Sequence, residues 1–154
     1  MTIKVEIEVN ESFVSPKSVD EVFALLADVP ESASYFPDVE ELNDLGDNCF
    51  QWKMEKVGAG DHAIQTIYSA EYTVNAEEGT ITWEPIEDDE GNSEVSGSWT
   101  ISETDEGTLA EFSSNACLTL PLPGLLKMAI SPVVKKEFGK KISKYLEGIE
   151  GALS

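Results

Sequence analysis

The chain has 154 residues, 41% of them hydrophobic, and a formal net charge of -20 at pH 7. This length and apolar fraction exclude a disordered polyanion and predict one domain spanning residues 1–154. All ten basic residues are lysines, so the acidity and the lack of guanidinium clamps predict no nucleic-acid partner.

The N-terminal part predicts a strand followed by two short helices. Residues 3–13 alternate apolar and polar side chains, which is the pattern of a half-buried strand. In "SPKSVDEVFALLADV", Ser18 and Glu21 form a capping box ahead of a short apolar face, and Pro30 is expected to end the helix. "ESASYFPDV" predicts a second short helix that ends at Pro37.

From Val39 to Leu120 the hydrophobic period changes to two. Turn signals such as Asp47-Asn48 and Gly91-Asn92 recur at regular intervals. The alternation between them predicts six strands at 39–46, 49–57, 63–76, 80–86, 93–103 and 108–120. With the first strand they predict an antiparallel sheet of seven strands.

After Pro123 the pattern is helical to the C-terminus. Ser131-Pro132 fits the start of a new helix as well as a kink in one helix, and we expect a long helix bent there with its main part at 132–151. Residues 127–154 hold six lysines and three acids. That helix therefore presents either a solvated lysine face or a docking patch for an acidic protein partner.

The order of these elements resembles the START-like, helix-grip superfamily. The residues that carry the resemblance are "SPKSVDEVFALLADV", Pro37-Asp38-Val39, Gly107-Thr108-Leu109 and the proline-rich "LTLPLPGLLKMAISPVVKKEF". The superfamily includes lipid-transfer START domains, birch-pollen allergen relatives, and bacterial polyketide cyclase/dehydrase and coenzyme Q-binding proteins. The resemblance implies an α+β helix-grip fold. In it a curved seven-stranded antiparallel sheet wraps around the long C-terminal helix, two short helices follow the first strand, and a hydrophobic cavity lies between sheet and helix.

The strand alternation indicates which side chains face that interior. Bulky aromatic residues alternate there with Ala, Gly and Ser, which favours a ligand cavity but also fits an interlocked, filled core. The short helices and the start of the last helix are expected to form the mouth. The predicted ligand-binding residues are Tyr35, Phe36, Trp52, Tyr68, Tyr72, Trp83, Gly97, Trp99, Phe112, Ser114, Leu125 and Met128.

Residues suited to catalysis or metal binding are sparse. His62 is the only histidine, and it lies in a predicted turn, while Cys49 and Cys117 lack metal-ligand spacing. We therefore predict no catalytic residue, no metal and no cofactor. The two cysteines and the absence of an apolar leader favour a cytoplasmic protein with reduced thiols. No apolar run reaches the roughly 20 residues of a membrane span, so we expect no stable membrane insertion.

The leading hypothesis is a protein that binds or carries an apolar small molecule: a lipid, isoprenoid, quinone or polyketide-like compound. Burial of the ligand's apolar surface would supply the affinity, at about 25 cal/mol per Å². Two alternatives stay open at this point. One is an enzyme of the cyclase/dehydrase type, which would need polar groups deep in the pocket. The other is a non-catalytic protein-interaction domain.

Overall fold

A computed structural model of the chain describes residues 2–56, 65–88 and 91–154. The secondary structure follows the predicted order. It consists of β1 (Ile3–Ser15), α1 (Val19–Ala27), α2 (Val29–Ala33), β2 (Val39–Gly46), β3 (Cys49–Met54), β4 (Ile67–Asn75), β5 (Thr80–Pro85), β6 (Ser93–Thr104), β7 (Gly107–Leu120), the 3-10 turn η2 (Gly124–Leu126) and α3 (Lys127–Ala152). The predicted turn around His62 and parts of the two strands beside it lie outside the described residues.

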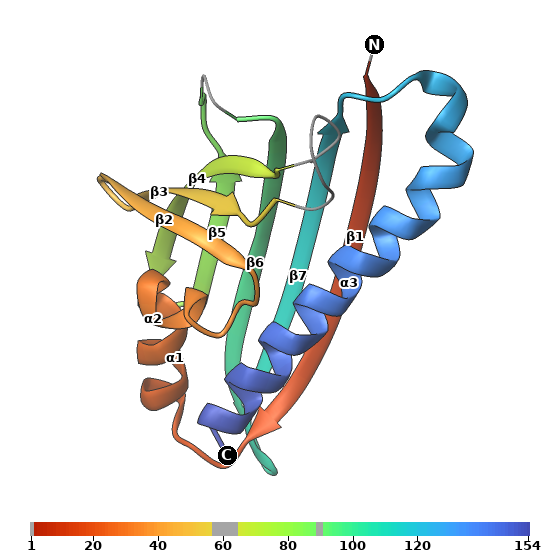
Figure 1. The fold of residues 1–154 in the computed structure, drawn as a ribbon. Helices are drawn as coiled ribbons and strands as arrows, with labels where there is room; N and C mark the ends of the chain where they lie inside the picture. Colours follow the sequence, from red (N-terminus) through yellow and green to blue (C-terminus); the bar gives the residue numbers. More distant parts are fainter. Residues whose placement is uncertain (1, 57–64, 89–90) are drawn as a thin grey trace.

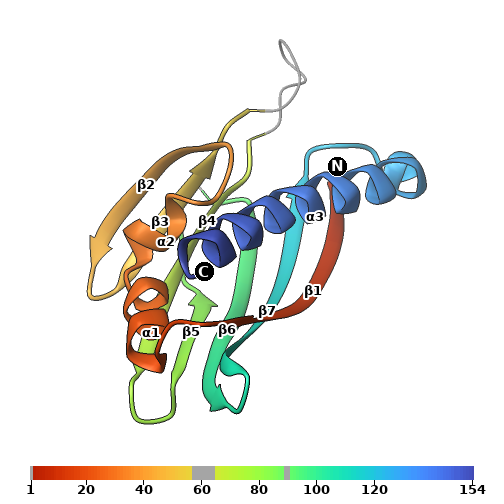
Figure 2. The ribbon, with the colours of Figure 1, turned by 90° about the horizontal axis from the view of Figure 1, so that it is seen from below.

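The seven strands form one antiparallel sheet in the order β1-β7-β6-β5-β4-β3-β2. Strands β2 to β7 follow one another as a meander, and β1 pairs with β7 from Ile3↔Leu120 to Ser15↔Thr108. The sheet curves, and α3 runs across its concave side (Figures 1 and 2). The predicted α+β helix-grip fold is therefore confirmed.

The two short helices begin and end at different residues from those predicted. The capping box of α1 is present, because Ser18 Oγ accepts from the backbone N–H of Glu21 at 3.2 Å. However, α1 ends at Ala27, and Asp28 then caps α2 by accepting from the N–H of Glu31 at 3.2 Å. Pro30 lies in the first turn of α2, where a missing N–H breaks no helical hydrogen bond. The second helix therefore begins one residue before the proline that was expected to end the first.

Helix α3 begins earlier than predicted and continues through Pro132. Proline cannot donate to the carbonyl four residues earlier, which here belongs to Met128. The Met128 side chain is 91% exposed, so this part of the helix lies in solvent, where water can hydrate a free carbonyl. The long C-terminal helix that the sequence predicted is therefore present with Pro132 inside it, although it begins at Lys127, five residues before the main part expected at 132–151.

The core lies between the concave face of the sheet and the C-terminal half of α3. Ile142, Tyr145 and Ile149 are the buried residues of that helix. The end of the chain is fixed to β1, because Leu153 is buried and its carbonyl accepts a hydrogen bond from the Ser15 hydroxyl. The N-terminal half of α3 is mostly exposed. Over the described part of the chain, no helix is both long enough and apolar enough to cross a bilayer.

Candidate ligand-binding site

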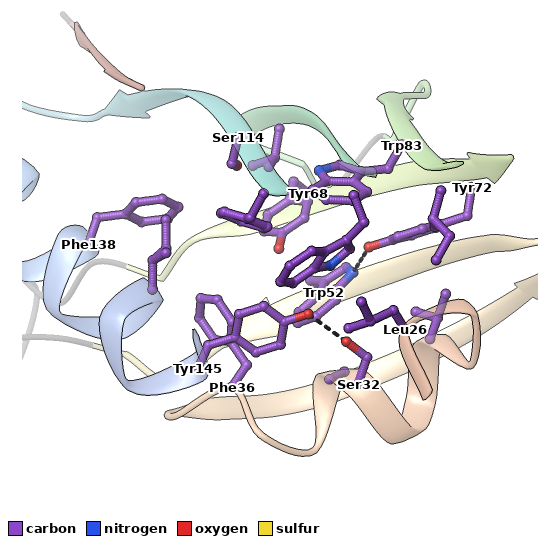
Figure 3. A pocket seen from close by; sticks show the side chains of 17 residues that line it. Leu26, Ser32, Phe36, Trp52, Tyr68, Tyr72, Trp83, Ser114, Phe138 and Tyr145 are labelled. Atoms are coloured by element: carbon purple, nitrogen blue, oxygen red, sulfur yellow. Dashed lines mark hydrogen bonds between the residues drawn. The ribbon is translucent and has the colours of Figure 1, made fainter. Parts of the chain in front are cut away.

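A cavity of about 60 Å³ lies between the sheet, the two short helices and α3. Its walls come from the sheet, the two short helices and α3 (Figure 3). Strands β3 to β7 form the floor, α1 and α2 form one side, and α3 from Phe138 to Tyr145 forms the roof. The lining residues are Leu26, Val29, Ser32, Ala33, Phe36, Trp52, Tyr68, Tyr72, Ile81, Trp83, Val95, Trp99, Phe112, Ser114, Phe138, Ile142 and Tyr145.

Aromatic rings fill most of the space beneath α3. Trp52 and Tyr68 are stacked, with centroids 5.7 Å apart and planes 13° apart. Trp99 is 2% exposed, and its ring lies 5.0 Å from Phe112 and 6.4 Å from Tyr145 of α3. The inward orientation predicted for Trp99 and Phe112 is confirmed.

The size of the cavity follows from this packing. A cavity of about 60 Å³ has room for only a few water molecules. Pockets that hold drug-sized molecules measure about 300–1,000 Å³. A ligand of that size must therefore displace side chains of the roof or the walls. In this conformation the interior is a closely packed aromatic core with a small residual space.

Hydrogen bonds hold two of the phenols that face the cavity. Tyr145 Oη and Ser32 Oγ lie 2.5 Å apart and join α3 to α2. Trp52 Nε1 donates to Tyr72 Oη at 3.1 Å and joins β3 to β4. Burial raises the pKa of Tyr68, Tyr72 and Tyr145 above the ordinary tyrosine value, although the hydrogen bonds to Tyr72 and Tyr145 offset part of the effect. All three side chains are neutral hydroxyl groups at physiological pH.

Eight of the twelve residues proposed as ligand-binding line this cavity. Tyr35 does not, because its ring packs against α3 at Gly148, where an added Cβ would lie 3.1 Å from Tyr35 Cδ1. Leu125 and Met128 are 95% and 91% exposed. The eight that do line it are Phe36, Trp52, Tyr68, Tyr72, Trp83, Trp99, Phe112 and Ser114.

Gly97 also lies outside the lining, because the Trp83 ring covers it. The two residues pair across β5 and β6, and a Cβ built on Gly97 would lie 2.6 Å from Trp83 Cζ2 and closer still to the Ser113 carbonyl oxygen. The glycine therefore makes room for the indole and leaves no space for a ligand at this position.

The short helices and the start of α3 were predicted to form one mouth of the cavity, but the structure does not bring them together. Phe36 packs on Tyr145, with ring centroids 5.4 Å apart, near the C-terminal end of α3. Met128 is 17 residues earlier in the helix, which is about 25 Å at 1.5 Å per residue. The short helices and the start of α3 therefore lie at opposite ends of the molecule (Figure 2).

The lining residues that the prediction missed come mainly from the helices. Phe138, Ile142 and Tyr145 follow one another at spacings of four and three on α3, which is the spacing of one helical face. The alternation along a strand shows directly which side chains face the interior. For a helix, the rotation about its own axis must also be known before its inward face can be assigned. The tyrosine in this apolar face is the signal that could have identified it.

Charged side chains are outside the cavity. No residue in the described lining is acidic or basic. Lys141 Nζ instead contacts Asp38 Oδ2 at 2.7 Å on the surface and lowers the pKa of that carboxyl group. Within the described ranges, no three His, Cys, Asp or Glu residues form a potential metal site.

Fold and site together define a helix-grip domain with an aromatic interior. A family model described as "Polyketide cyclase / dehydrase and lipid transport" matches residues 6–146. The chain belongs to this family. No curated protein matches it.

Several solved structures share the fold. The Zhui aromatase/cyclase from Streptomyces sp. R1128 is 14% identical, with 96% of this chain and 93% of that chain covered and a TM-score of 0.67. A START superfamily protein from Mycobacterium smegmatis is 16% identical, with 95% and 96% covered and a TM-score of 0.67. The di-domain ARO/CYC StfQ of the steffimycin biosynthetic pathway is 12% identical with a TM-score of 0.63, and 97% of this chain covers 51% of its length. At these identities the likeness establishes the fold alone.

Proposed function

We propose that this protein binds or carries an apolar small molecule, such as a lipid, isoprenoid, quinone or polyketide-like compound, between the sheet and α3. The observation that carries the proposal is the lining itself. Nine of its seventeen residues are aromatic, including all three tryptophans of the chain. Aromatic walls with a few polar tips are typical of small-molecule sites, and the family of this chain includes lipid transport in its description.

Binding requires the roof of the cavity to yield. Phe138, Ile130 and Val134 on the N-terminal half of α3 are only partly buried, whereas Ile142 and Ile149 farther along are buried. Less packing is therefore lost when the first half of the helix moves than when the second half moves. We place ligand entry beneath Phe138.

Native mass spectrometry of the purified protein tests the proposal. We expect a fraction of the protein to carry an additional apolar mass that disappears after delipidation on a hydrophobic resin. The delipidated protein should regain mass when it is incubated with a mixed lipid and quinone extract. If the protein is always observed at its bare mass and takes up nothing from the extract, the proposal is wrong.

The cyclase alternative receives less support from the described site. An efficient general acid or base has a pKa near the working pH. The titratable groups of the described lining are three phenols whose pKa values burial raises, which makes them poor bases at neutral pH. We therefore propose binding and carriage and assign no reaction.

We further propose that the exposed start of α3 is a surface for an acidic protein partner. Residues 121–136 contain three lysines and no acid, and Leu125 and Met128 are exposed beside them. This basic, apolar tip contrasts with the charge of -20 on the whole chain. Binding of a polyglutamate peptide should weaken when Lys135 and Lys136 are both replaced by Gln; equal binding by both proteins would contradict the proposal.

We also propose the cytoplasm as the location. Cys49 and Cys117 are both unpaired thiols, and free thiols are the rule in reducing compartments. A thiol-specific label applied to intact cells and then to lysed cells tests this. Labelling only after lysis is expected, and labelling of intact cells by an impermeant reagent would contradict it.

A further inference from the structure

Tyr68 differs from the other two phenols of the cavity. Tyr68 is 7% exposed and belongs to β4. Figure 3 shows its hydroxyl oxygen pointing into the space between Phe138 and Tyr145. Tyr145 is bonded to Ser32 and Tyr72 to Trp52, but within the described ranges Tyr68 Oη forms no hydrogen bond with the protein.

The hydroxyl of Tyr68 is not needed for packing. Its ring stacks on Trp52, and a phenylalanine ring would stack in the same way. Among the described residues, Ser131 Oγ is the one fully buried side-chain polar atom without a hydrogen-bond partner, so the unpaired Tyr68 oxygen is open to the space of the cavity. A hydroxyl group in this position is available to a water molecule or to a ligand that enters the cavity.

A second hydroxyl faces the same space. Ser114 on β7 is 4% exposed and lines the cavity, and among the described residues its Oγ also has no hydrogen-bond partner. Two uncharged hydroxyl groups, on β4 and β7, thus remain available to a ligand. Each can donate one hydrogen bond and accept others.

The charge of the walls restricts the ligand further. The described lining contains no lysine and no histidine, and Lys141 is paired with Asp38 on the surface. A carboxylate or phosphate moved into this space would lose its hydration without gaining a counter-charge. A neutral carbonyl or hydroxyl group loses much less and is matched by a phenol that donates.

From this geometry we infer that the cavity selects flat, neutral, oxygen-bearing ligands of the aromatic ketone or quinone class over anionic lipids such as free fatty acids, and that Tyr68 Oη donates a hydrogen bond to the ligand's carbonyl oxygen. The inference rests on the proposed binding function. It adds the class of ligand and the residue that recognises the ligand by a hydrogen bond.

Three naphthalenes of nearly the same shape test the inference: 2-acetylnaphthalene is a neutral ketone, 2-ethylnaphthalene has no oxygen, and 2-naphthoate is an anion. Isothermal titration calorimetry should show the ketone binding about fivefold more tightly than the hydrocarbon, as one neutral hydrogen bond provides. The anion should bind more weakly than both. Tyr68→Phe should reduce the affinity for the ketone to that for the hydrocarbon and leave the affinity for the hydrocarbon unchanged. Tyr35→Phe, the same change outside the cavity, should alter neither.

The outcomes separate this inference from the function on which it rests. If the hydrocarbon binds but the ketone has no advantage, if the advantage survives Tyr68→Phe, or if the anion binds best, the inference is wrong and the binding function stands. If none of the three binds, the inference is wrong, and the native mass spectrometry described above decides whether the binding function stands. A measurement on the unmodified protein covers the case in which Tyr68→Phe does not fold. The infrared carbonyl stretch of the bound ketone should shift to lower frequency than in hydrocarbon solvent, and an unshifted band overturns the inference.

Discussion

Replacing Gly97 with alanine tests the packing that defines the interior. The added Cβ would lie 2.6 Å from Trp83 Cζ2 and would also meet the Ser113 carbonyl oxygen. One of these neighbours is backbone and the other is a rigid indole that is 8% exposed, so neither can yield cheaply. Overpacking of this kind costs about 1–3 kcal/mol of unfolding free energy. For a domain of this size, each kcal/mol lowers the melting temperature by about 2–4 °C, so a loss of about 2–12 °C is expected.

Thermal unfolding followed by circular dichroism measures the loss, and Gly139→Ala is the matched control. Gly139 lies in α3, and a Cβ built there has no neighbour within 4 Å. Alanine in a helix is more favourable than glycine by about 1 kcal/mol, so the control should raise the melting temperature. The two identical substitutions should therefore act in opposite directions. An unchanged melting temperature for Gly97→Ala would mean that Trp83 does not cover Gly97 and that the β5–β6 register is wrong.

Three further predictions concern the buried phenols and the charge. Tyr145→Phe should lower the urea unfolding free energy by about 1–3 kcal/mol, because Ser32 Oγ loses its buried partner; an unchanged midpoint would show that the bond is not formed. The contribution of the buried tyrosines to stability should be constant below pH ~10 and be lost above it, because burial raises the pKa of Tyr68, Tyr72 and Tyr145 and the unfolded chain releases those protons first. Normal tyrosine ionisation in the folded protein, measured by ultraviolet absorbance, would refute this. The charge of -20 predicts no appreciable binding to DNA or anionic vesicles at physiological salt, and tight, salt-sensitive binding in a gel-shift or flotation assay would contradict it.

The sheet could be predicted because a strand pattern has few possible interpretations. Successive residues of β6 and β7 alternate between the two faces, so Trp99 and Phe112 could only share one face or the other. The pairing Trp99↔Phe112 in the structure confirms that assignment. The capping box of Ser18 and Glu21 was equally readable, because it depends on two neighbouring residues and not on tertiary contacts.

Two kinds of error came from contacts that the pattern does not contain. Gly97 was interpreted as open space, but whether a glycine leaves a void or receives a neighbouring ring depends on the cross-strand partner, here Trp83. Leu125 and Met128 were placed at the mouth because they follow the prolines, whereas the direction of α3 carries them away from the short helices. Alternation also could not give the cavity volume, which depends on how far the aromatic rings interlock.

The most direct test of the central claim uses the three tryptophans that line the cavity. Energy transfer from tryptophan to the neutral dye N-phenyl-1-naphthylamine should be saturable in the wild-type protein. Ser114→Leu replaces a hydroxyl oxygen with three carbon atoms at a wall of the cavity and should weaken binding of the dye at least tenfold. Ser113→Leu is the matched control, because Ser113 is the neighbouring residue on the opposite face, where its hydroxyl contacts Asn10, and it should bind the dye as the wild type does. If the wild type shows no saturable transfer, or if the two variants bind the dye equally well, the interior between the sheet and α3 is not a ligand site.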